Sequence, residues 1–193
     1  MHNEIIVAGF GGQGILLAGA IVSQAAMEQG LYTTWFPAYG AEMRGGTANS
    51  TVVISSEEIG SPLAFNPNAL IALNEPSLNK FMPRMVKDSV IIANSSIIAQ
   101  NKDYKITPYF VPVTGIADKE IGNIKTANMV AVGALVKALE LCATKACKIE
   151  SEILSIKNVL KAVEIAFAAK PKFIDINKKA IMAGYDFIKE TTN

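Results

Sequence analysis

A glycine-rich stretch near the start of the chain has the residue types and spacing of an anion-binding loop. Residues 9–14 read Gly-Phe-Gly-Gly-Gln-Gly, follow an apolar run at 5–8 and precede a long helical pattern. Glycines allow a tight turn and a close approach to the backbone, and the unpaired N–H groups of a helix start attract negative charge. The spacing fits G-x-G-x-x-G, a pattern that also occurs in turns that bind nothing. The stretch therefore indicates a strand, a turn and a helix N-terminus suited to a phosphate or diphosphate.

The residues that follow do not fit the use of this loop for NAD. A dinucleotide-binding unit carries an Asp or Glu at the end of its second strand, about 20 residues after the glycines, to hold the ribose hydroxyls. Here the second strand is expected over 31–36, and it runs into Pro-Ala-Tyr-Gly with no acid in place. The first carboxylate is Glu42, already in a loop, and Arg44 leaves room for a phosphorylated ribose. Plain NAD is therefore not expected as a ligand.

A second group of residues suited to binding lies in the loop after this strand, within residues 37–49. Taken singly, each has an ordinary structural role as a turn residue, a half-buried aromatic or a solvated ion pair. Together they favour a recognition loop, because arginine offers a fixed fork to carboxylate or phosphate and glycines let the backbone approach a ligand. The strand places this loop at the same rim as the glycine-rich stretch, so the two are expected to share one site. The candidates here are Tyr39, Gly40, Glu42, Arg44, Gly45 and Gly46.

Short apolar segments alternate with helical ones along most of the chain. They lack the alternation of a half-exposed strand, which is typical of a parallel sheet covered on both faces. The sequence thus predicts an α/β, Rossmann-like fold with a mostly parallel sheet, helices on both faces and further C-terminal helices. The strand at 105–112 contains Pro108 and Pro112 and suits a sheet edge. We expect strands at 4–8, 31–36, 51–54, 69–73, 90–93 and 105–112, and helices at 13–29, 76–83, 126–142, 150–168 and 176–190.

Three of these segments carry more detailed expectations. The first strand, the helix at 13–29 and the strand at 31–36 are expected to form a first βαβ unit. Thr126 is expected to cap the helix at 126–142. The segment 150–168 is amphipathic, and the side chains expected to point inward are Ile153, Ile156, Leu160, Val163 and Phe167.

Length and composition bound the function. The chain has 193 residues, of which 50% are hydrophobic and 18% charged, with a formal net charge of +1. We expect one domain over 1–193, with a C-terminal helical segment from about residue 150. The high apolar fraction suggests burial against another chain, which is either a different subunit or a second copy in a homodimer. The low net charge argues against binding to nucleic acid or to an anionic membrane surface. No apolar run reaches the length of about 18 residues that a membrane-spanning helix needs, and no leader is recognised at the N-terminus, so we expect a cytoplasmic protein.

The residues needed for metal or cluster chemistry are missing from the sequence. The two cysteines, Cys142 and Cys147, are five apart in a helical pattern and are expected to form neither a cluster ligand set nor a disulfide. There is no Gly-Asp-Gly motif of the kind that holds magnesium diphosphate, and the single histidine, His2, lies at a terminus. We therefore expect no metal site and no catalytic residue in this chain.

The two loops together resemble those of the gamma subunit of 2-oxoacid:ferredoxin (acceptor) oxidoreductases, a family that acts on pyruvate, 2-oxoisovalerate or 2-oxoglutarate. The match rests on the stretch at 9–14, with Gln before the last Gly, followed by Pro-Ala-Tyr-Gly-Ala-Glu-Met-Arg-Gly-Gly at 37–46. It covers nearly the whole chain, most clearly residues 4–140, whereas the C-terminal helices match only in general character. The other matching segments are Ser61-Pro62, Asn74-Glu75-Pro76-Ser77, Asn94-Ser95 and the region from Asn123 to Asn128-Met129.

The resemblance implies a division of labour between subunits. Enzymes of this family use thiamine diphosphate and magnesium to decarboxylate a 2-oxoacid, pass electrons through iron–sulfur clusters to ferredoxin or a similar acceptor, and transfer the acyl group to coenzyme A. This chain would bind none of these cofactors alone. It would pack on the thiamine-binding subunits and help form or cover the coenzyme A site. The candidate cofactor-binding residues are Gly9, Gly11, Gly12, Gln13, Gly14, the six loop residues named above, Asn123 and Asn128.

Two other functions remain open from the sequence. A free-standing oxidoreductase that binds NADP or a flavin nucleotide would use the glycine loop and Arg44, but it lacks the strand-end acid and a catalytic His, Lys or Cys near the rim. A purely structural subunit would use the glycines only for tight packing. The sequence does not choose among pyruvate, branched-chain 2-oxoacids and 2-oxoglutarate, because the substrate pocket is expected mainly on other chains.

Overall fold

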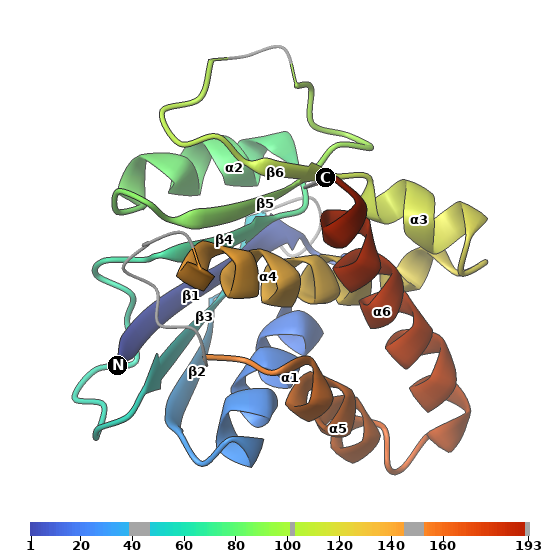
Figure 1. Cartoon of the computed structure of the whole chain (residues 1–193), viewed down its shortest axis with the longest axis horizontal. Coiled ribbons are helices and arrows are strands. Elements are labelled where there is room, and N and C mark those ends of the chain that lie inside the picture. Colours follow the sequence, from blue (N-terminus) through green and yellow to red (C-terminus); the bar gives the residue numbers. More distant parts are fainter. Residues whose placement is uncertain (39–46, 101–102, 145–152, 192–193) are drawn as a thin grey trace.

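The structure, a computed structural model, describes residues 1–38, 47–100, 103–144 and 153–191. They form a six-stranded sheet in the order β2-β3-β1-β4-β5-β6, with helices on both faces (Figure 1). The strands are β1 (His2–Phe10), β2 (Tyr32–Ala38), β3 (Thr47–Ser55), β4 (Ala69–Ala72), β5 (Val90–Asn94) and β6 (Tyr109–Val111). The helices are α1 (Ile15–Glu28), α2 (Glu75–Phe81), α3 (Val113–Lys119), α4 (Ala127–Thr144), α5 (Ile156–Ala166) and α6 (Ile174–Thr191), with 3-10 turns η1 (Met82–Arg84), η2 (Ile124–Thr126) and η3 (Pro171–Phe173).

The sheet is mostly parallel, with one reversed strand. β1, β4, β5 and β6 pair in parallel, whereas β3 lies between β1 and β2 and is antiparallel to both. The predicted α/β fold is therefore confirmed. The expected βαβ unit is wrong in one respect, because β1 and β2 are not neighbours. The chain reverses after β2 and inserts β3 between them.

Alternate residues of the central strands face two separate hydrophobic cores. On one face Ile5 and Val7 pack with residues of α1, α3, α4, α5 and α6. On the other face Ile6 and Ala8 pack with α2 through Leu78 and Phe81. Figure 1 shows α2 on the far side of the sheet from α1. This burial on both faces explains why the strands are continuous apolar runs in the sequence.

The C-terminal helices belong to the larger core. α5 starts later than the sequence indicated, after Ser155, whose side chain accepts a hydrogen bond from the backbone N–H of Asn158. The side chains expected to point inward do so: Ile153 and Val163 are buried, and Ile156, Leu160 and Phe167 pack against the core. No helix in the described ranges is long and apolar enough to cross a membrane.

Two local features differ from the sequence-based expectation. β6 covers only Tyr109–Val111 at the sheet edge, as the prolines indicated, but the next residues form α3, which the sequence did not reveal. Thr126 does not cap α4. It ends η2, and its hydroxyl donates to the backbone carbonyl of Asn123, which itself caps η2 by accepting from the N–H of Lys125.

Cys142, near the end of α4, is disulfide-bonded, so the expectation that the chain forms no disulfide is wrong. That expectation assumed that one helix carries both cysteines at fixed spacing, whereas α4 ends at Thr144. The other cysteine of the chain, Cys147, lies outside the described residues.

Candidate functional site

The carboxyl ends of β1, β4, β5 and β6 lie along one edge of the sheet, because these strands are parallel. A pocket of about 300 Å³ opens at this rim. It brings the glycine-rich loop together with segments that follow β4, β5 and α3. The lining residues are Gly12, Gln13, Leu73, Asn94, Ile97, Thr114, Ile124, Lys125 and Ala127.

The glycine-rich loop has the strand, turn and helix order that the sequence indicated. Two hydrogen bonds close the turn: the Gln13 N–H donates to the Phe10 carbonyl at 3.1 Å, and the Phe10 N–H donates to Gln13 Oε1 at 2.7 Å. Within the described ranges the amides of Gly11, Gly12 and Gly14 have no acceptor, and α1 has neither a side-chain cap nor an acid in its first turn. These N–H groups are thus free to bind an anion at the helix start.

The glycines of this loop serve two different purposes. At Gly9 a Cβ would lie 2.6 Å from both Gln13 Oε1 and Ile15 Cδ1, and at Gly14 it would lie 2.4 Å from Asn128 Nδ2. Asn128 is 2% exposed and donates to the Gly14 carbonyl at 3.0 Å. At Gly11 a Cβ would meet only open space. Gly9 and Gly14 are therefore needed for packing, whereas Gly11 borders space that a ligand can enter.

Side-chain amides tie the rim together. Gln13 Oε1 accepts from Asn74 Nδ2 at 3.3 Å, and Gln13 Nε2 donates to the Leu73 carbonyl at 3.5 Å. Asn94 Nδ2 donates to the same carbonyl at 3.3 Å and to Thr114 Oγ1 at 2.9 Å. The loop after β1, the ends of β4 and β5 and the start of α3 are thus fixed relative to one another. Asn94 and Thr114 were missed as site residues, although Asn94 ends β5 and Thr114 comes shortly after β6, so the carboxyl-end rule could have found them.

Lys125 is the one charged residue among those that line the pocket. It lies on η2, is exposed, and makes no ion pair with any described residue. Asn123 fixes its backbone by accepting from its N–H at 3.1 Å. Beside it, Ile97 and Ile124 are 54% and 55% exposed. The pocket therefore suits an anionic group joined to a less polar arm, and Lys125 is a further residue that sequence reasoning missed.

The second predicted loop cannot be placed. Tyr39, Gly40, Glu42, Arg44, Gly45 and Gly46 lie outside the described residues. The residues on either side do lie at the rim: β2 ends at Ala38, and Thr47, which starts β3, pairs with Phe10 directly before the glycine loop. That the two loops share one site remains a prediction.

The sheet order weakens the nucleotide-binding alternative. In a dinucleotide-binding unit the strand that offers the ribose acid lies beside the strand that leads into the glycines. Here β3 separates β2 from β1.

Among the described residues there is no group of three or more His, Cys, Asp or Glu suited to a metal ion.

Comparison with known families decides the assignment. The model of the pyruvate ferredoxin/flavodoxin oxidoreductase family matches residues 4–187, almost the whole chain. The chain belongs to this family. The resemblance inferred from the two loops is thus confirmed.

Two relatives within the family differ in length. Ketoisovalerate oxidoreductase subunit VorA of Methanothermobacter thermautotrophicus is 39% identical over 187 residues, which are 97% of this chain and 36% of VorA. 2-Oxoglutarate synthase subunit KorC of Methanocaldococcus jannaschii is 32% identical over 193 residues, which cover 98% of this chain and 96% of KorC. The chain thus spans about a third of VorA and nearly all of KorC.

Solved structures of two oxidoreductases have the same fold. The gamma subunit of a keto/oxoacid ferredoxin oxidoreductase from Geobacter sulfurreducens has a TM-score of 0.77 and 26% identity, with 97% of this chain and 99% of that chain covered. The 2-oxoglutarate:ferredoxin oxidoreductase of Magnetococcus marinus, solved with 2-oxoglutarate, coenzyme A and succinyl-CoA bound, has a TM-score of 0.78 at 22% identity. This chain covers 31% of that longer chain. The described chain therefore has the fold of a whole gamma subunit.

Proposed function

We propose that this chain is the gamma subunit of a multi-subunit oxidoreductase that oxidatively decarboxylates a 2-oxoacid to an acyl-CoA, with ferredoxin or a similar protein as electron acceptor. Its near-complete overlap with KorC and with the Geobacter sulfurreducens gamma subunit supports this role. Partner subunits would supply thiamine diphosphate, magnesium and iron–sulfur clusters, and with them the cleavage of the 2-oxoacid. The expected location of the complex is the cytoplasm.

The lining of the pocket at the rim supports our proposal that this chain contributes to a coenzyme A site. Coenzyme A combines phosphates with a long, less charged arm, and the pocket combines Lys125 and the free amides near Gly12 with the exposed Ile97 and Ile124. Amides at a helix start and a lysine ammonium both attract phosphate. The oxidoreductase from Magnetococcus marinus, which has the same fold, holds coenzyme A, a ligand of this chemistry.

The chain's own residues would bind and position rather than react. Lys125 and the amides of Gly11 and Gly12 would hold anionic groups, and the Gln13 and Asn94 amides would keep their geometry fixed. The apolar side chains around them would keep water away from the arm of the cofactor. The predicted loop residue Arg44 would add a second cation if its loop reaches this rim.

Reconstitution tests the proposal. The partner polypeptides of the same organism are purified with and without this chain, and 2-oxoacid-dependent reduction of the acceptor is measured with and without coenzyme A. We expect coenzyme A-dependent turnover only when the chain is present. Full turnover without it, or binding of NADPH by the isolated chain with reductase activity, would contradict the proposal.

A further inference from the structure

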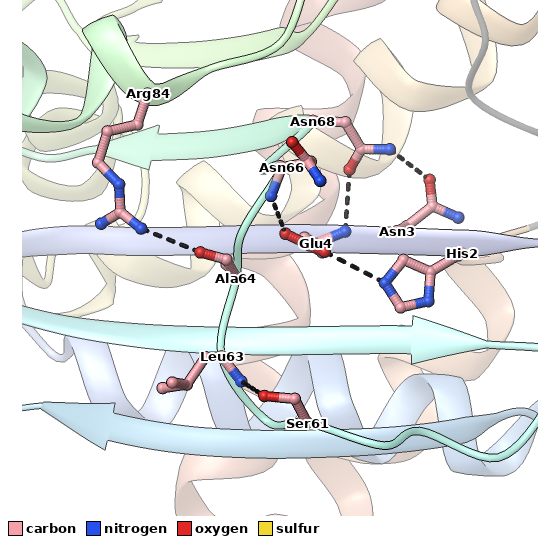
Figure 2. Close-up of polar contacts among 9 residues, drawn as sticks. All are labelled: His2, Asn3, Glu4, Ser61, Leu63, Ala64, Asn66, Asn68 and Arg84. Carbon is pink, nitrogen blue, oxygen red and sulfur yellow. Dashed lines mark hydrogen bonds and ion pairs between the residues drawn. The ribbon is translucent and has the colours of Figure 1, made fainter.

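Among the described residues, no helix covers β2 and β3 on the face of the sheet that α2 covers elsewhere (Figure 1). Instead, residues 61–68 cross β2, β3 and β1 on this face as an extended strap (Figure 2). The strap and the strands beneath it border a groove of about 240 Å³. The residues that line the groove are Phe36, Ala38, Asn49, Thr51, Leu63, Ala64, Phe65 and Arg84.

Hydrogen bonds at Ala64 and Asn66, the two neighbours of Phe65 in the sequence, hold the strap in place, and Figure 2 draws these bonds. Before it, the Ala64 carbonyl accepts from Arg84 Nη2 at 3.0 Å. After it, the Asn66 N–H donates to the carboxylate of the buried Glu4 at 2.6 Å, and Asn68 Oδ1 accepts from the Glu4 N–H at 3.0 Å. The backbone around Phe65 is therefore ordered before any partner binds, which lowers the entropy cost of association.

The side chains that this strap presents are apolar and exposed. Phe65 is 68% exposed, Leu63 47%, and Phe36 on the neighbouring β2 43%. Ala64 between them is buried, so the strap points its large side chains outward and its small one inward. Contiguous apolar surface of this kind on an ordered backbone is typical of a protein interface, where aromatic residues provide much of the binding energy.

Arg84 is the only charged residue among those that line the groove. It is exposed and forms no ion pair with a described residue, while one of its N–H groups holds the strap. The remaining donors of the guanidinium can bind a carboxylate. A complementary partner would therefore offer an apolar socket with an acidic residue at its margin.

We propose that Phe36, Leu63, Phe65 and Arg84 form the surface that docks on the catalytic polypeptide of the oxidoreductase, an inference that rests on the proposed function. In VorA this domain is joined to a further stretch of chain, since only 36% of VorA matches, so covalent linkage holds another polypeptide segment close to the same fold. A second copy is a poorer fit, because its own groove would bring another Arg84 and no lining carboxylate.

Binding of the purified chain to its partner polypeptides tests this surface. The variants are Phe65→Ser and Arg84→Glu, and the matched control is Met27→Ser, a 57% exposed residue on α1 on the other face of the sheet. The dissociation constant is measured by sedimentation velocity, and the melting temperature of each variant is compared with that of the wild type. We expect the dissociation constant to rise about thirtyfold or more for Phe65→Ser and about tenfold for Arg84→Glu. The melting temperature of Phe65→Ser and the dissociation constant of the Met27→Ser control should not change.

The outcomes separate this proposal from the proposed function. If the wild-type chain does not bind the partner polypeptides, the proposed function fails and the docking surface fails with it. If it binds and both variants bind equally well, only the docking surface is overturned. If Phe65→Ser instead dissociates a dimer of the isolated chain, the occupant is a second copy and the proposal is wrong.

Discussion

Backbone geometry separates Gly14 from Gly11 in the loop at the start of α1. Gly14 has φ +73°, and its missing side chain leaves room for Asn128. Gly14→Ala should therefore lower the free energy of unfolding by about 1–3 kcal/mol, because the alanine is strained and crowds Asn128. Gly11→Ala enters open space and should change that free energy by less than about 0.5 kcal/mol. Urea unfolding of both variants checks this pair, and equal losses would show that crowding at Asn128 does not matter.

Arg44→Ala in the assembled enzyme should weaken coenzyme A-dependent turnover more than electron release to an artificial acceptor. The reason is that Arg44 is predicted to serve an anionic cofactor at the rim, whereas the thiamine chemistry is proposed to belong to other subunits. Loss of one charge-assisted hydrogen bond costs about 1.5–3 kcal/mol, or roughly ten- to a hundredfold in apparent affinity. Steady-state kinetics at varied coenzyme A concentration measure this apparent affinity. An unchanged affinity in an intact complex would make Arg44 a solvated or interface ion-pair partner.

The sequence predicted some residues of the pocket and missed others for a physical reason. Gly12 and Gln13 belong to a motif whose glycine spacing alone predicts a strand, a turn and a helix start. Lys125 is an exposed lysine, and nothing local distinguishes it from other solvated charges until the fold sets η2 opposite Gly12. Asn94 stands between these cases, because its position after a buried strand was visible but its hydrogen bonds were not.

Close packing of α4 on α6 depends on one glycine from each helix. A Cβ at Gly133 would lie 1.8 Å from the Ile181 carbonyl oxygen, and one at Gly184 would lie 1.9 Å from that of Val130. Gly133→Ala should therefore force the helices apart and cost about 2–3 kcal/mol. Gly115→Ala on α3, where the nearest atom is 3.5 Å away, is the matched control and should be neutral or slightly stabilising. Thermal unfolding decides it, and equal stability of the two variants would contradict the close crossing.

A polar cluster also joins α4 to α6. The Tyr185 hydroxyl donates to Glu140 Oε2 at 2.6 Å, and Lys137 Nζ lies 3.2 Å from the same oxygen. Burial and the Glu140 carboxylate raise the pKa of Tyr185 above its usual 10.0. Burial alone would lower the pKa of Lys137, but hydrogen bonds to Glu140 and Tyr185 outweigh it and raise that pKa above 10.5.

These directions predict how stability changes at high pH. Because both pKa values are raised in the folded state, the cluster stabilises the fold fully below about pH 10, and this contribution is lost as the pH rises through the folded-state values. Tyr185→Phe should cost about 1 kcal/mol at pH 8 and much less at pH 11. The free energy of unfolding of the wild type and of Tyr185→Phe is measured between pH 8 and pH 11. A difference between the two proteins that does not change with pH would contradict the stabilising role of the Tyr185 hydroxyl.

The sequence patterns predicted the positions of most helices and strands but not the direction or order of the strands in the sheet. Apolar runs located the strands of the described sheet, and the sequence also predicted helices at the positions of α1, α2, α4, α5 and α6. Strand direction is not encoded in such runs, so the insertion of β3 between β1 and β2 was not foreseen. The role of Gly133 was equally hidden, because it depends on which face of α4 meets α6.

At the scale of the whole molecule, the described residues present two surfaces to which we assign binding roles. One is the pocket at the carboxyl rim, with Lys125 and the glycine-loop amides. The other is the strap of residues 61–68, which crosses the sheet where no described helix covers it (Figure 2) and on which Phe65 is exposed. Relatives carry this domain either nearly alone, as in KorC, or as about a third of a longer chain, as in VorA. A domain that binds part of a cofactor on one surface and docks on a catalytic polypeptide with another accounts for both arrangements.

The coenzyme A dependence of Lys125→Gln in the assembled complex is the most direct measurement of the central proposal. Lys119→Gln, an exposed lysine at the end of α3 outside the pocket, is the matched control, and Lys125→Arg keeps the charge. We expect Lys125→Gln to raise the apparent KM for coenzyme A roughly ten- to a hundredfold, with the KM for the 2-oxoacid unchanged, and Lys125→Arg to recover most of the affinity. An unchanged KM for coenzyme A in an intact Lys125→Gln complex would contradict the account.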